Sequence, residues 1–376
     1  MRPVPNKVDR KFYGDAVYGI THGYDDAGNP IRGRKELGAQ EAAQAEPEAH
    51  EPWVVAQASS APQAVSAVGL LFPGQGSQYV QMMKEVKTKP GVQSMLAIAK
   101  DVLDFDLLEV CLSGPDSEFD KPEVLLPCMY VACLAAVEKL REGAREVAER
   151  PGALAGLFVG EYTALTTAGV WSFKTGLSLV KAYGEAIAAA VKDGKTGSIS
   201  VAGIEKGKLA GLCEQAKTQI GGGAVCQINM ELFPKGFSCG CSMAALDVLK
   251  GLAEKNGALQ CKVTRAFGAI HTPAMESVRA VMEEKLKEAL PSMRPPRCDV
   301  YLNSTGKAIR KGTQPKELVA PLAAQVSSPV LWEKCVSSMI TMGVEEFYEV
   351  GPSKQLKAMM KRIDPSVWGR TKNVEI

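Results

Sequence analysis

The stretch Gly156–Glu161 constrains the fold of this chain more than any other part of the sequence. It follows Ala153–Ala155, which is short and apolar enough to form a buried strand. It precedes Tyr162–Gly169, which is typical of a helix that ends at a glycine. A strand, a glycine-flanked turn and a helix form a nucleophile elbow, whose usual pattern is Gly-x-Ser-x-Gly. Here both glycines are present but the central residue is Phe158, so the pattern predicts the scaffold of an elbow without its nucleophile.

Composition is typical of a globular protein and argues against several functions. Of the 376 residues, 46% are hydrophobic and 23% are charged, as in ordinary globular domains. The net charge of +2 and the lack of a Lys/Arg stripe interleaved with aromatic residues argue against nucleic-acid binding. The sequence has no run of about 18 or more apolar residues, so we predict no transmembrane segment.

The ten cysteines and three histidines argue against a metal site. The cysteines form no CxxC pair, and the spacing of Cys239 and Cys241 is more typical of one strand face than of metal ligands. We therefore predict no metal ligands, and reduced thiols in an intracellular compartment.

Residues 1–66 are predicted to form an extended N-terminal arm. Residues 1–36 mix charged, glycine and aromatic residues without a helix or strand period. Residues 37–66 are low in complexity and rich in Ala, Gln, Glu and Pro, with four acidic residues and no Lys or Arg. Such a composition cannot bury enough apolar surface to fold alone. Met1–Pro5 lacks the apolar core of a secretory signal, and an organellar presequence stays open as an alternative.

Two folded parts follow the arm. Strand-like and helix-like segments alternate over residues 67–191 and 266–376, which favours a mostly parallel sheet of the α/β class. Within this body, residues 173–191 are predicted to form a helix rich in small residues and suited to close packing. Residues 192–265 show the order β-α-β-β-α-β, which is the ferredoxin-like order and predicts an inserted small subdomain.

Five motifs occur in a fixed order along the folded part. They are Phe72–Gln78, the elbow with Gly160–Tyr162, His271–Pro273, Gln325 with Ser328–Trp332, and Glu349–Pro352. Together they resemble the malonyl-CoA:acyl-carrier-protein transacylases and the acyltransferase domains of polyketide synthases, over roughly residues 67–365. The resemblance implies an α/β-hydrolase-like body with a parallel sheet and an inserted ferredoxin-like subdomain.

The resemblance also implies a site and its chemistry. In that family an elbow serine attacks malonyl-CoA, a histidine takes its proton, and a glutamine carbonyl orients the histidine. Two backbone amides form the oxyanion hole, and the malonyl unit then passes to the phosphopantetheine thiol of acyl carrier protein. At matching positions this sequence has His271 for the base, Gln325 for its orienter, and Gln75 and Val159 for the oxyanion amides.

The sequence departs from the family at the positions that carry the reaction. Leu157 and Phe158 replace a His-Ser pair, and Tyr183 replaces the helix arginine that holds the malonyl carboxylate. Leu126 replaces a glutamine, and Met230–Leu232 replaces an Asn-Tyr-Asn stretch. Loss of a triad nucleophile alone costs a factor on the order of 10⁶ in turnover, so we predict that malonyl transfer is lost.

The remnant residues also have structural interpretations. Without a serine, His271 is expected to be a buried, hydrogen-bonded structural residue, and Gln325 to satisfy nearby backbone groups. We expect the Phe158 ring to be buried, with no serine hydroxyl or cysteine thiol within reach of His271. The alternative of a relocated nucleophile has three candidates, none of them in an elbow: Ser77, Ser198 and Ser200.

These features favour a non-catalytic homologue that acts as a structural or protein-binding subunit of a larger assembly, with residues 1–66 contacting protein partners. One alternative is an active acyl or malonyl transferase of fatty-acid synthesis with an altered nucleophile. Another is a docking module for acyl carrier protein, with Lys250, Lys255 and Lys262 as candidate contacts. We predict no cofactor, and the resemblance leaves CoA or phosphopantetheine binding open. A catalytically dead copy with an added arm favours the mitochondrion, with plastid and cytoplasm as alternatives.

Overall fold

The computed structural model describes residue 54, residues 67–264 and residues 267–376, all within the unit Glu51–Ile376. The N-terminal arm predicted over residues 1–66 lies outside the described residues, apart from Val54, which is buried in the main core.

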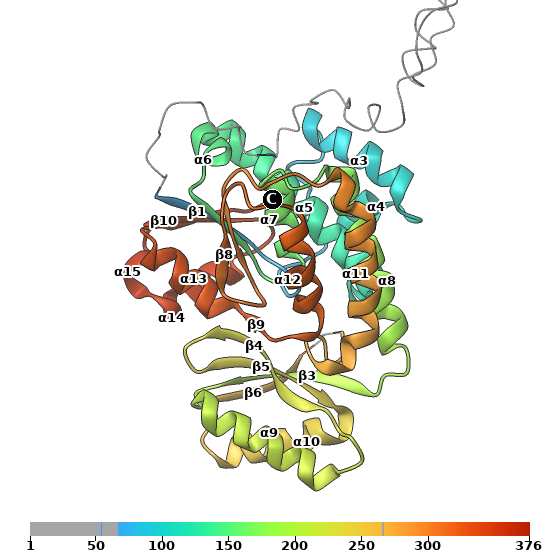
Figure 1. The fold of residues 1–376 in the computed structure, drawn as a ribbon, viewed down its shortest axis with the longest axis vertical. Coiled ribbons are helices and arrows are strands. Elements are labelled where there is room, and N and C mark those ends of the chain that lie inside the picture. Colours follow the sequence, from blue (N-terminus) through green and yellow to red (C-terminus); the bar gives the residue numbers. More distant parts are fainter. Residues whose placement is uncertain (1–53, 55–66, 265–266) are drawn as a thin grey trace, which may run out of the picture. The chain divides into compact units, whose positions relative to one another are not determined.

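A six-stranded sheet, drawn in Figure 1, is built from segments spread over most of the described chain. Its strand order is β11-β10-β1-β2-β7-β8, and every neighbouring pair is parallel except β7 with β8. The strands are β1 (Val68–Phe72), β2 (Ala153–Gly156), β7 (Asp299–Leu302), β8 (Lys307–Ile309), β10 (Glu346–Val350) and β11 (Thr371–Val374). The parallel core of this sheet confirms the α/β body that the alternating pattern predicted.

A second, five-stranded sheet has the order β6-β3-β5-β4-β9. Its strands are β3 (Thr196–Ala202), β4 (Cys226–Phe233), β5 (Gly236–Ser242), β6 (Gln260–Thr264) and β9 (Val330–Leu331). Helices α9 (Lys206–Ile220) and α10 (Met243–Lys255) cover one face of it (Figure 1). The order β3-α9-β4-β5-α10-β6 is the predicted ferredoxin-like order. Strand β9 pairs in parallel with β4 and comes from outside residues 192–265, which the sequence pattern did not predict.

The remaining helices belong to the body. They are α3 (Pro90–Val102), α4 (Leu107–Ser113), α5 (Pro122–Gly143), α6 (Arg145–Glu149), α7 (Gly160–Thr167), α8 (Phe173–Val191), α11 (Glu276–Ala289), α12 (Lys316–Ser327), α13 (Trp332–Thr341), α14 (Gln355–Ile363) and α15 (Pro365–Trp368). Short 3₁₀ turns span Asp116–Asp120, Pro273–Met275 and Leu290–Ser292.

The six-stranded sheet is buried on both faces. Successive residues of a strand point to opposite faces. Accordingly, Leu70 and Phe72 of β1 join the core that contains α5, α7 and α8, whereas Leu71 joins the core that contains α13 and α14. Strands that are covered on both faces are apolar throughout, which explains why β1 lacks polar alternation.

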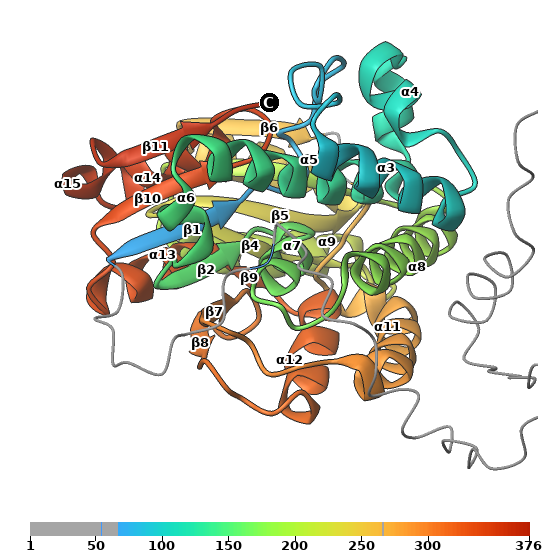
Figure 2. The same ribbon diagram turned by 90° about the horizontal axis from the view of Figure 1, so that it is seen from above.

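Helix α8 spans the residues predicted for it and packs against α5 and α3 (Figure 2). A side chain at Gly184 would bring its Cβ to 2.6 Å from the Pro122 carbonyl oxygen of α5. The small residues of α8 therefore permit a close helix–helix approach, as the sequence indicated. This packing fixes Tyr183, the residue before Gly184, inside the core.

Candidate functional site

The turn between β2 and α7 has the geometry of a nucleophile elbow. Phe158 at its centre has φ = +55°, a left-handed conformation that is unusual for a bulky side chain. The flanking glycines are required by close backbone contacts. A Cβ at Gly156 would lie 1.9 Å from the carbonyl carbon of Gly160, and one at Gly160 would lie 2.3 Å from the Phe72 carbonyl oxygen. The glycine spacing of the sequence therefore corresponds to a true elbow.

Asn303, which follows β7, fixes the elbow from the neighbouring strand. Its Oδ1 accepts from the Phe158 backbone N–H at 2.8 Å, and its Nδ2 donates to the Gly156 carbonyl at 2.6 Å. Its own backbone N–H donates to Glu161 Oε2 at 2.5 Å. We call Gly156, Gly160 and Asn303 the elbow frame. The sequence analysis missed Asn303, because only its position after a buried strand pointed to it.

Glu161 is completely buried beside this frame. Burial raises the pKa of its carboxyl to about 8, and the hydrogen bond from the Asn303 amide opposes this rise. Its Oε1 has no hydrogen-bond partner within the described ranges. Burial therefore favours the protonated form of Glu161, whose Oε2 supports the elbow by accepting from the Asn303 backbone N–H.

His271 lies next to Phe158, although the two residues are far apart in sequence. Its Nδ1 is 2.7 Å from the Gln325 backbone carbonyl oxygen, which fixes the proton on Nδ1 and leaves Nε2 as an acceptor. Gln325 also donates from Nε2 to the Phe158 carbonyl at 3.0 Å. The structure thus brings together the predicted base position, its orienter and the elbow.

Burial keeps His271 neutral. The side chain is fully buried, and burial lowers its pKa to about 4. In the part of the chain that the structure describes, Nε2 has no hydrogen-bond partner, so no serine hydroxyl or cysteine thiol bonds to it there. This agrees with the expectation for a base position without its nucleophile.

Aromatic rings fill the space beside His271. The Phe158 ring, 1% exposed, meets the imidazole edge to face, with ring centroids 5.0 Å apart and an interplanar angle of 89°. It also meets Tyr183 edge to face at 5.7 Å, and Tyr183 lies 5.7 Å from the Tyr162 ring. We call Phe158, Tyr162 and Tyr183 the aromatic cluster. The predicted burial of the Phe158 ring is confirmed.

Burial also suppresses ionisation within the cluster. The pKa of the Tyr183 phenol is raised well above its ordinary value by burial and by the nearby Tyr162 and Glu161. The family resemblance predicts an arginine at position 183, and the Tyr183 phenol offers no positive charge to a carboxylate. Leu126 of α5, where the resemblance predicts a glutamine, is fully buried in the same core.

Two of the replaced residues lie elsewhere. Leu157 belongs to the core on the other face of the sheet, with Leu71 and Trp332, and half-buried Leu232 packs against that same core. They do not join the aromatic cluster, because consecutive residues of the elbow point to opposite sides. The sequence had grouped these leucines with Phe158 as one rewritten pocket, and the structure separates them.

The loop after β1 packs directly on the elbow. A Cβ at Gly74 would lie 2.3 Å from the Leu157 carbonyl oxygen. Gln75 follows it in the loop and is half-buried, while Val159 is buried at the start of α7. The two residues predicted to supply oxyanion amides thus flank the contact between loop and elbow.

The serines considered as relocated nucleophiles make other contacts. Ser77 Oγ donates to Gln355 Oε1 at 2.7 Å, and Ser198 Oγ donates to the Gly268 carbonyl at 2.8 Å. Ser200 is half-buried in β3. Neither the Ser77 nor the Ser198 hydrogen bond is to a base that could activate the hydroxyl.

Asn229 of β4 is a further site residue that the sequence analysis missed. It is fully buried, and its Nδ2 donates to the Ile270 carbonyl at 2.8 Å, directly before His271. It thereby ties the small sheet to the strained backbone of His271, whose φ is +58°. The sequence analysis named Met230–Leu232 as a departure from the family but did not name the adjacent Asn229.

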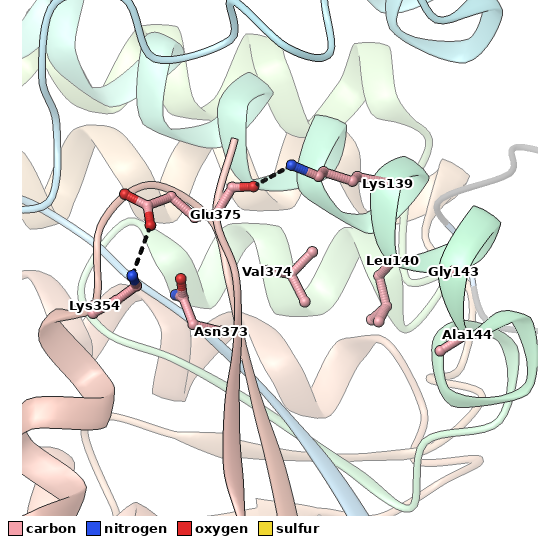
Figure 3. Close-up of a pocket in the computed structure, with 8 residues that line it drawn as sticks. All are labelled: Lys139, Leu140, Gly143, Ala144, Lys354, Asn373, Val374 and Glu375. Atoms are coloured by element: carbon pink, nitrogen blue, oxygen red, sulfur yellow. Dashed lines mark hydrogen bonds and ion pairs between the residues drawn. The ribbon is translucent and has the colours of Figure 1, made fainter.

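The cavity in Figure 3 lies away from these residues, between the end of α5 and β11. It has a volume of about 570 Å³ and is lined by Lys139, Leu140, Gly143, Ala144, Lys354, Asn373, Val374 and Glu375. None of the predicted site residues lines it.

Residues 67–264 and 267–376 contain no helix that is both long and apolar enough to cross a membrane. The same ranges hold no group of three or more His, Cys, Asp or Glu residues arranged to bind a metal ion.

Comparisons with known proteins match most of the described chain. The family model of the acyl transferase domain matches residues 70–364. The chain is 33% identical to the mitochondrial malonyl-CoA-acyl carrier protein transacylase of Homo sapiens over 318 residues, covering 82% of this chain and 80% of that protein. A solved malonyl-CoA:acyl carrier protein transacylase from Xanthomonas oryzae pv. oryzae superposes with a TM-score of 0.75 at 27% identity, covering 83% and 95% of the two chains.

A second solved structure is similar in fold. It is a malonyl-transacylase in complex with its type II PKS acyl-carrier protein, with a TM-score of 0.74, 24% identity, and coverage of 83% of this chain and 96% of that one. The extent of the sequence matches, together with the elbow, His271 and Gln325 in the expected arrangement, shows that this chain belongs to the malonyl-CoA:acyl-carrier-protein transacylase family.

Proposed function

We propose that this chain is a non-catalytic member of the family that acts as a structural or protein-binding subunit of a larger assembly. The observation that carries the proposal is the phenyl ring of Phe158 at the elbow, edge on to His271. Acyl transfer needs a nucleophile within hydrogen-bond reach of its base. A phenyl group can neither attack a thioester nor donate a proton to Nε2.

The carboxylate site supports the same proposal. A malonyl carboxylate is held best by a bidentate, charged guanidinium. Tyr183 is a buried phenol whose pKa is raised, so it remains neutral. Loss of one partner of a desolvated charge pair costs roughly 2–5 kcal/mol of recognition. The elbow and the clamp position therefore both disfavour malonyl transfer.

A labelling experiment tests this proposal. The full-length protein is incubated with radiolabelled malonyl-CoA and with a serine-directed fluorophosphonate, and transfer to holo acyl carrier protein is followed. We expect no covalent label and no transfer above background from the parent chain. Label on any residue of the parent would support the alternative, an active transferase with an altered nucleophile.

The double variant Phe158→Ser with Tyr183→Arg separates a missing nucleophile from a site that is unsuited to the reaction. If only these side chains are lacking, the variant acquires fluorophosphonate label at position 158. Phe158→Ser with Tyr183→Phe is the matched control, which restores the nucleophile without the charge. The difference in malonyl labelling between the two variants measures the contribution of the arginine.

The assembly role rests on residues 1–66, whose composition is that of an arm that folds only against a partner. Cross-linking and mass spectrometry in cells, with the full chain and with a variant lacking residues 1–66, tests it. We expect a defined set of protein partners that is lost on removal of the arm. Recovery of the full chain as a free monomer would contradict the role. Because the similar human transacylase is mitochondrial, we propose that this assembly lies in the mitochondrion, which cell fractionation tests.

Docking of acyl carrier protein is a second candidate, favoured by α14. This helix carries Lys357, Lys361 and Arg362 and no acidic residue, and Lys354 precedes it. Lys361 lies over the exposed Trp368 ring at 4.8 Å, and Arg362 lies over Phe233 at 4.7 Å. A basic surface with an aromatic residue suits an acidic partner helix. The structure of the malonyl-transacylase with its acyl-carrier protein supports this idea for the fold.

Titration with holo acyl carrier protein tests docking. Lys357→Glu with Lys361→Glu should weaken binding at least about tenfold, a loss of about 1.4 kcal/mol. Lys250→Glu with Lys255→Glu, at two exposed residues of α10 that the sequence had suggested as contacts, is the matched control of equal charge. Equal loss in both variants would show a non-specific charge effect, and a larger loss in the α10 variant would assign the contact to α10.

A further inference from the structure

Four buried cysteines gather between the small sheet and α9. They are Cys213, Cys226, Cys239 and Cys241. Their sulfurs form two contacting pairs: Cys226 and Cys241 lie 3.5 Å apart, and Cys213 and Cys239 lie 3.9 Å apart. All four are free thiols. Cys239 and Cys241 share one face of β5, as their spacing predicted.

The strand register distinguishes the pair Cys226 and Cys241 from the other contacting pair. Cys226 of β4 and Cys241 of β5 stand directly opposite each other. In the adjoining pair, the Ser242 backbone N–H donates to the Val225 carbonyl at 2.8 Å. Hydrogen-bonded and non-hydrogen-bonded pairs alternate along antiparallel strands, so Cys226 and Cys241 form a non-hydrogen-bonded pair, with Cα atoms about 4.5 Å apart. Disulfides span Cα separations of about 4.4–6.8 Å, so the backbone already permits a bond here.

A loosely packed loop gives access to Cys226. The residue directly follows the loop 221–225, in which Gly221, Gly222 and Gly223 are exposed and have positive φ. A Cβ at any of these glycines would meet no other atom within 4 Å. Loops with few contacts open at low free-energy cost. Opening of this loop, with loss of the hydrogen bonds between Val225 and Ser242, would expose Cys226, the first residue of β4.

The neighbouring thiols also affect the reactivity of Cys226. Its sulfur can accept from the Cys213 and Cys241 thiols, and these contacts lower the pKa of Cys226, while burial opposes them. A thiolate is the attacking species in thiol–disulfide exchange. Because Cys226 also directly follows the exposed glycine loop, whereas Cys241 lies within β5, Cys226 is the residue of the pair that reacts first.

We propose that Cys226 and Cys241 form a dithiol–disulfide site that is oxidised by a low-molecular-weight disulfide such as oxidised glutathione. The Cys226 thiolate attacks one sulfur of glutathione disulfide, and one glutathione thiolate leaves. The Cys241 thiolate then attacks the Cys226 sulfur and releases the second glutathione. The two cysteines lose two protons and two electrons, which convert one molecule of glutathione disulfide into two thiols.

The bond would fix the register of β4 on β5. Beyond Cys226 the pairing of these strands shifts twice, between Ile228 and Met230 and between Glu231 and Phe233. Asn229 lies at the first shift and holds the Ile270 carbonyl beside His271. Oxidation would thus stabilise the strand that supports the site, independently of whether the site is catalytic.

Redox titration of the native full-length protein tests this inference. The protein is equilibrated in buffers from fully reduced to fully oxidised glutathione, quenched with acid, alkylated in denaturant and digested for mass spectrometry. We expect a peptide pair joined through Cys226 and Cys241, with complete loss of alkylation at both. Cys298 and Cys335, buried outside the cluster, should remain fully alkylated, and reduced glutathione should reverse the bond.

Matched variants assign the bond. Cys226→Ser and Cys241→Ser should each abolish the joined peptide, whereas Cys261→Ser, at a half-buried cysteine outside both contacting pairs, should leave it unchanged. Full alkylation of Cys226 and Cys241 in oxidised buffer would overturn the proposal. A bond between Cys213 and Cys239 instead, or a bond that forms only in denaturant, would overturn it equally. The parent measurement decides the matter even if a variant fails to fold.

Discussion

At the two glycines of the elbow frame there is room for backbone only, whereas in the aromatic cluster beside it large side chains fill the space. A Cβ at Gly156 would overlap the backbone of Gly160 at 1.9 Å. In contrast, Phe158 and Tyr183 are each 1% exposed and meet through ring contacts that other side chains of similar volume could replace. Steric exclusion and hydrogen bonds fix the elbow frame, whereas side-chain packing holds the aromatic cluster together.

This difference explains how a nucleophile can be lost without the loss of its elbow. The Phe158 backbone is held by Asn303 and Gln325 through its N–H and carbonyl groups, which every residue type except proline possesses in full. The side chain at position 158 contributes nothing to these bonds. The elbow therefore depends on the backbone atoms of residue 158, whereas any chemistry at this position depends on its side chain.

Substitution in the frame should have the largest effect. Gly160→Ala would place a Cβ at 2.3 Å from the Phe72 carbonyl oxygen, a backbone atom of β1 that cannot move alone. We expect a loss of about 5 kcal/mol in the free energy of unfolding, measured by urea denaturation. Gly143→Ala, at the end of α5 with no atom within 4 Å of the new Cβ, should change stability by less than about 1 kcal/mol. Equal stability of both variants would refute the steric account.

Removal of the Asn303 side chain should have the second-largest effect on stability. Asn303→Ala leaves the buried Phe158 N–H and Gly156 carbonyl without these partners, at about 1–3 kcal/mol each. We expect a loss of about 4 kcal/mol and faster hydrogen exchange at the Phe158 amide. Asn373→Ala removes one bond, from Nδ2 to the Ser353 carbonyl, in a half-buried position and should cost about 1 kcal/mol. Slow exchange at Phe158 in the Asn303 variant would contradict the role of the frame.

The pH dependence of stability probes the boundary between the two regions. Burial lowers the pKa of His271 to about 4 in the folded chain, below its ordinary value of 6.5. As the pH falls, the unfolded chain takes up a proton at His271 before the folded chain does. The stability present above the unfolded pKa of 6.5 is therefore lost as the pH falls toward 4. Relative to His271→Gln, the parent should lose about 2 kcal/mol between about pH 7.5 and pH 5.

The comparison with the variant is necessary because Glu161 acts in the opposite direction. Its pKa is raised to about 8 in the folded chain, so its contribution is present below its ordinary value and is lost as the pH rises toward 8. Because Glu161 is present in both proteins, subtraction of the stability–pH profile of His271→Gln from that of the parent removes the Glu161 contribution. Parallel profiles for parent and variant would show that His271 is accessible to protons in the folded protein.

The smallest expected effect separates the backbone conformation of Phe158 from the packing of its ring. Phe158→Ala and Phe158→Gly both empty the ring site, but glycine adopts φ = +55° without strain. Phe158→Gly should therefore be about 1 kcal/mol more stable than Phe158→Ala. At Leu157, whose φ is not positive, the order should be reversed. The same order at both positions would mean that the elbow relaxes once the ring is removed.

The sequence predicted those parts of the site that depend on local spacing. The glycines at 156 and 160 identified the elbow, and the motif around His271 identified the base position. Asn303 and Asn229 were missed because their roles come from contacts with residues 145 and 41 positions away in the chain. The grouping of Leu157 with Phe158 was wrong because a turn sends adjacent side chains to opposite faces, which a list of replacements does not record.

Strand β9 gives the two sheets a mechanical connection. Val330 and Leu331 pair with Met230 and Glu231 at the edge of the small sheet, and the Leu331 backbone N–H donates to the Asn303 carbonyl at 2.8 Å. A force that tilts the small sheet would pull on β4, pass through β9 and reach the residue that holds the elbow. The two-residue strand β9 thus couples the small sheet to the elbow, and a partner bound to the small sheet would transmit force to the elbow without contacting it.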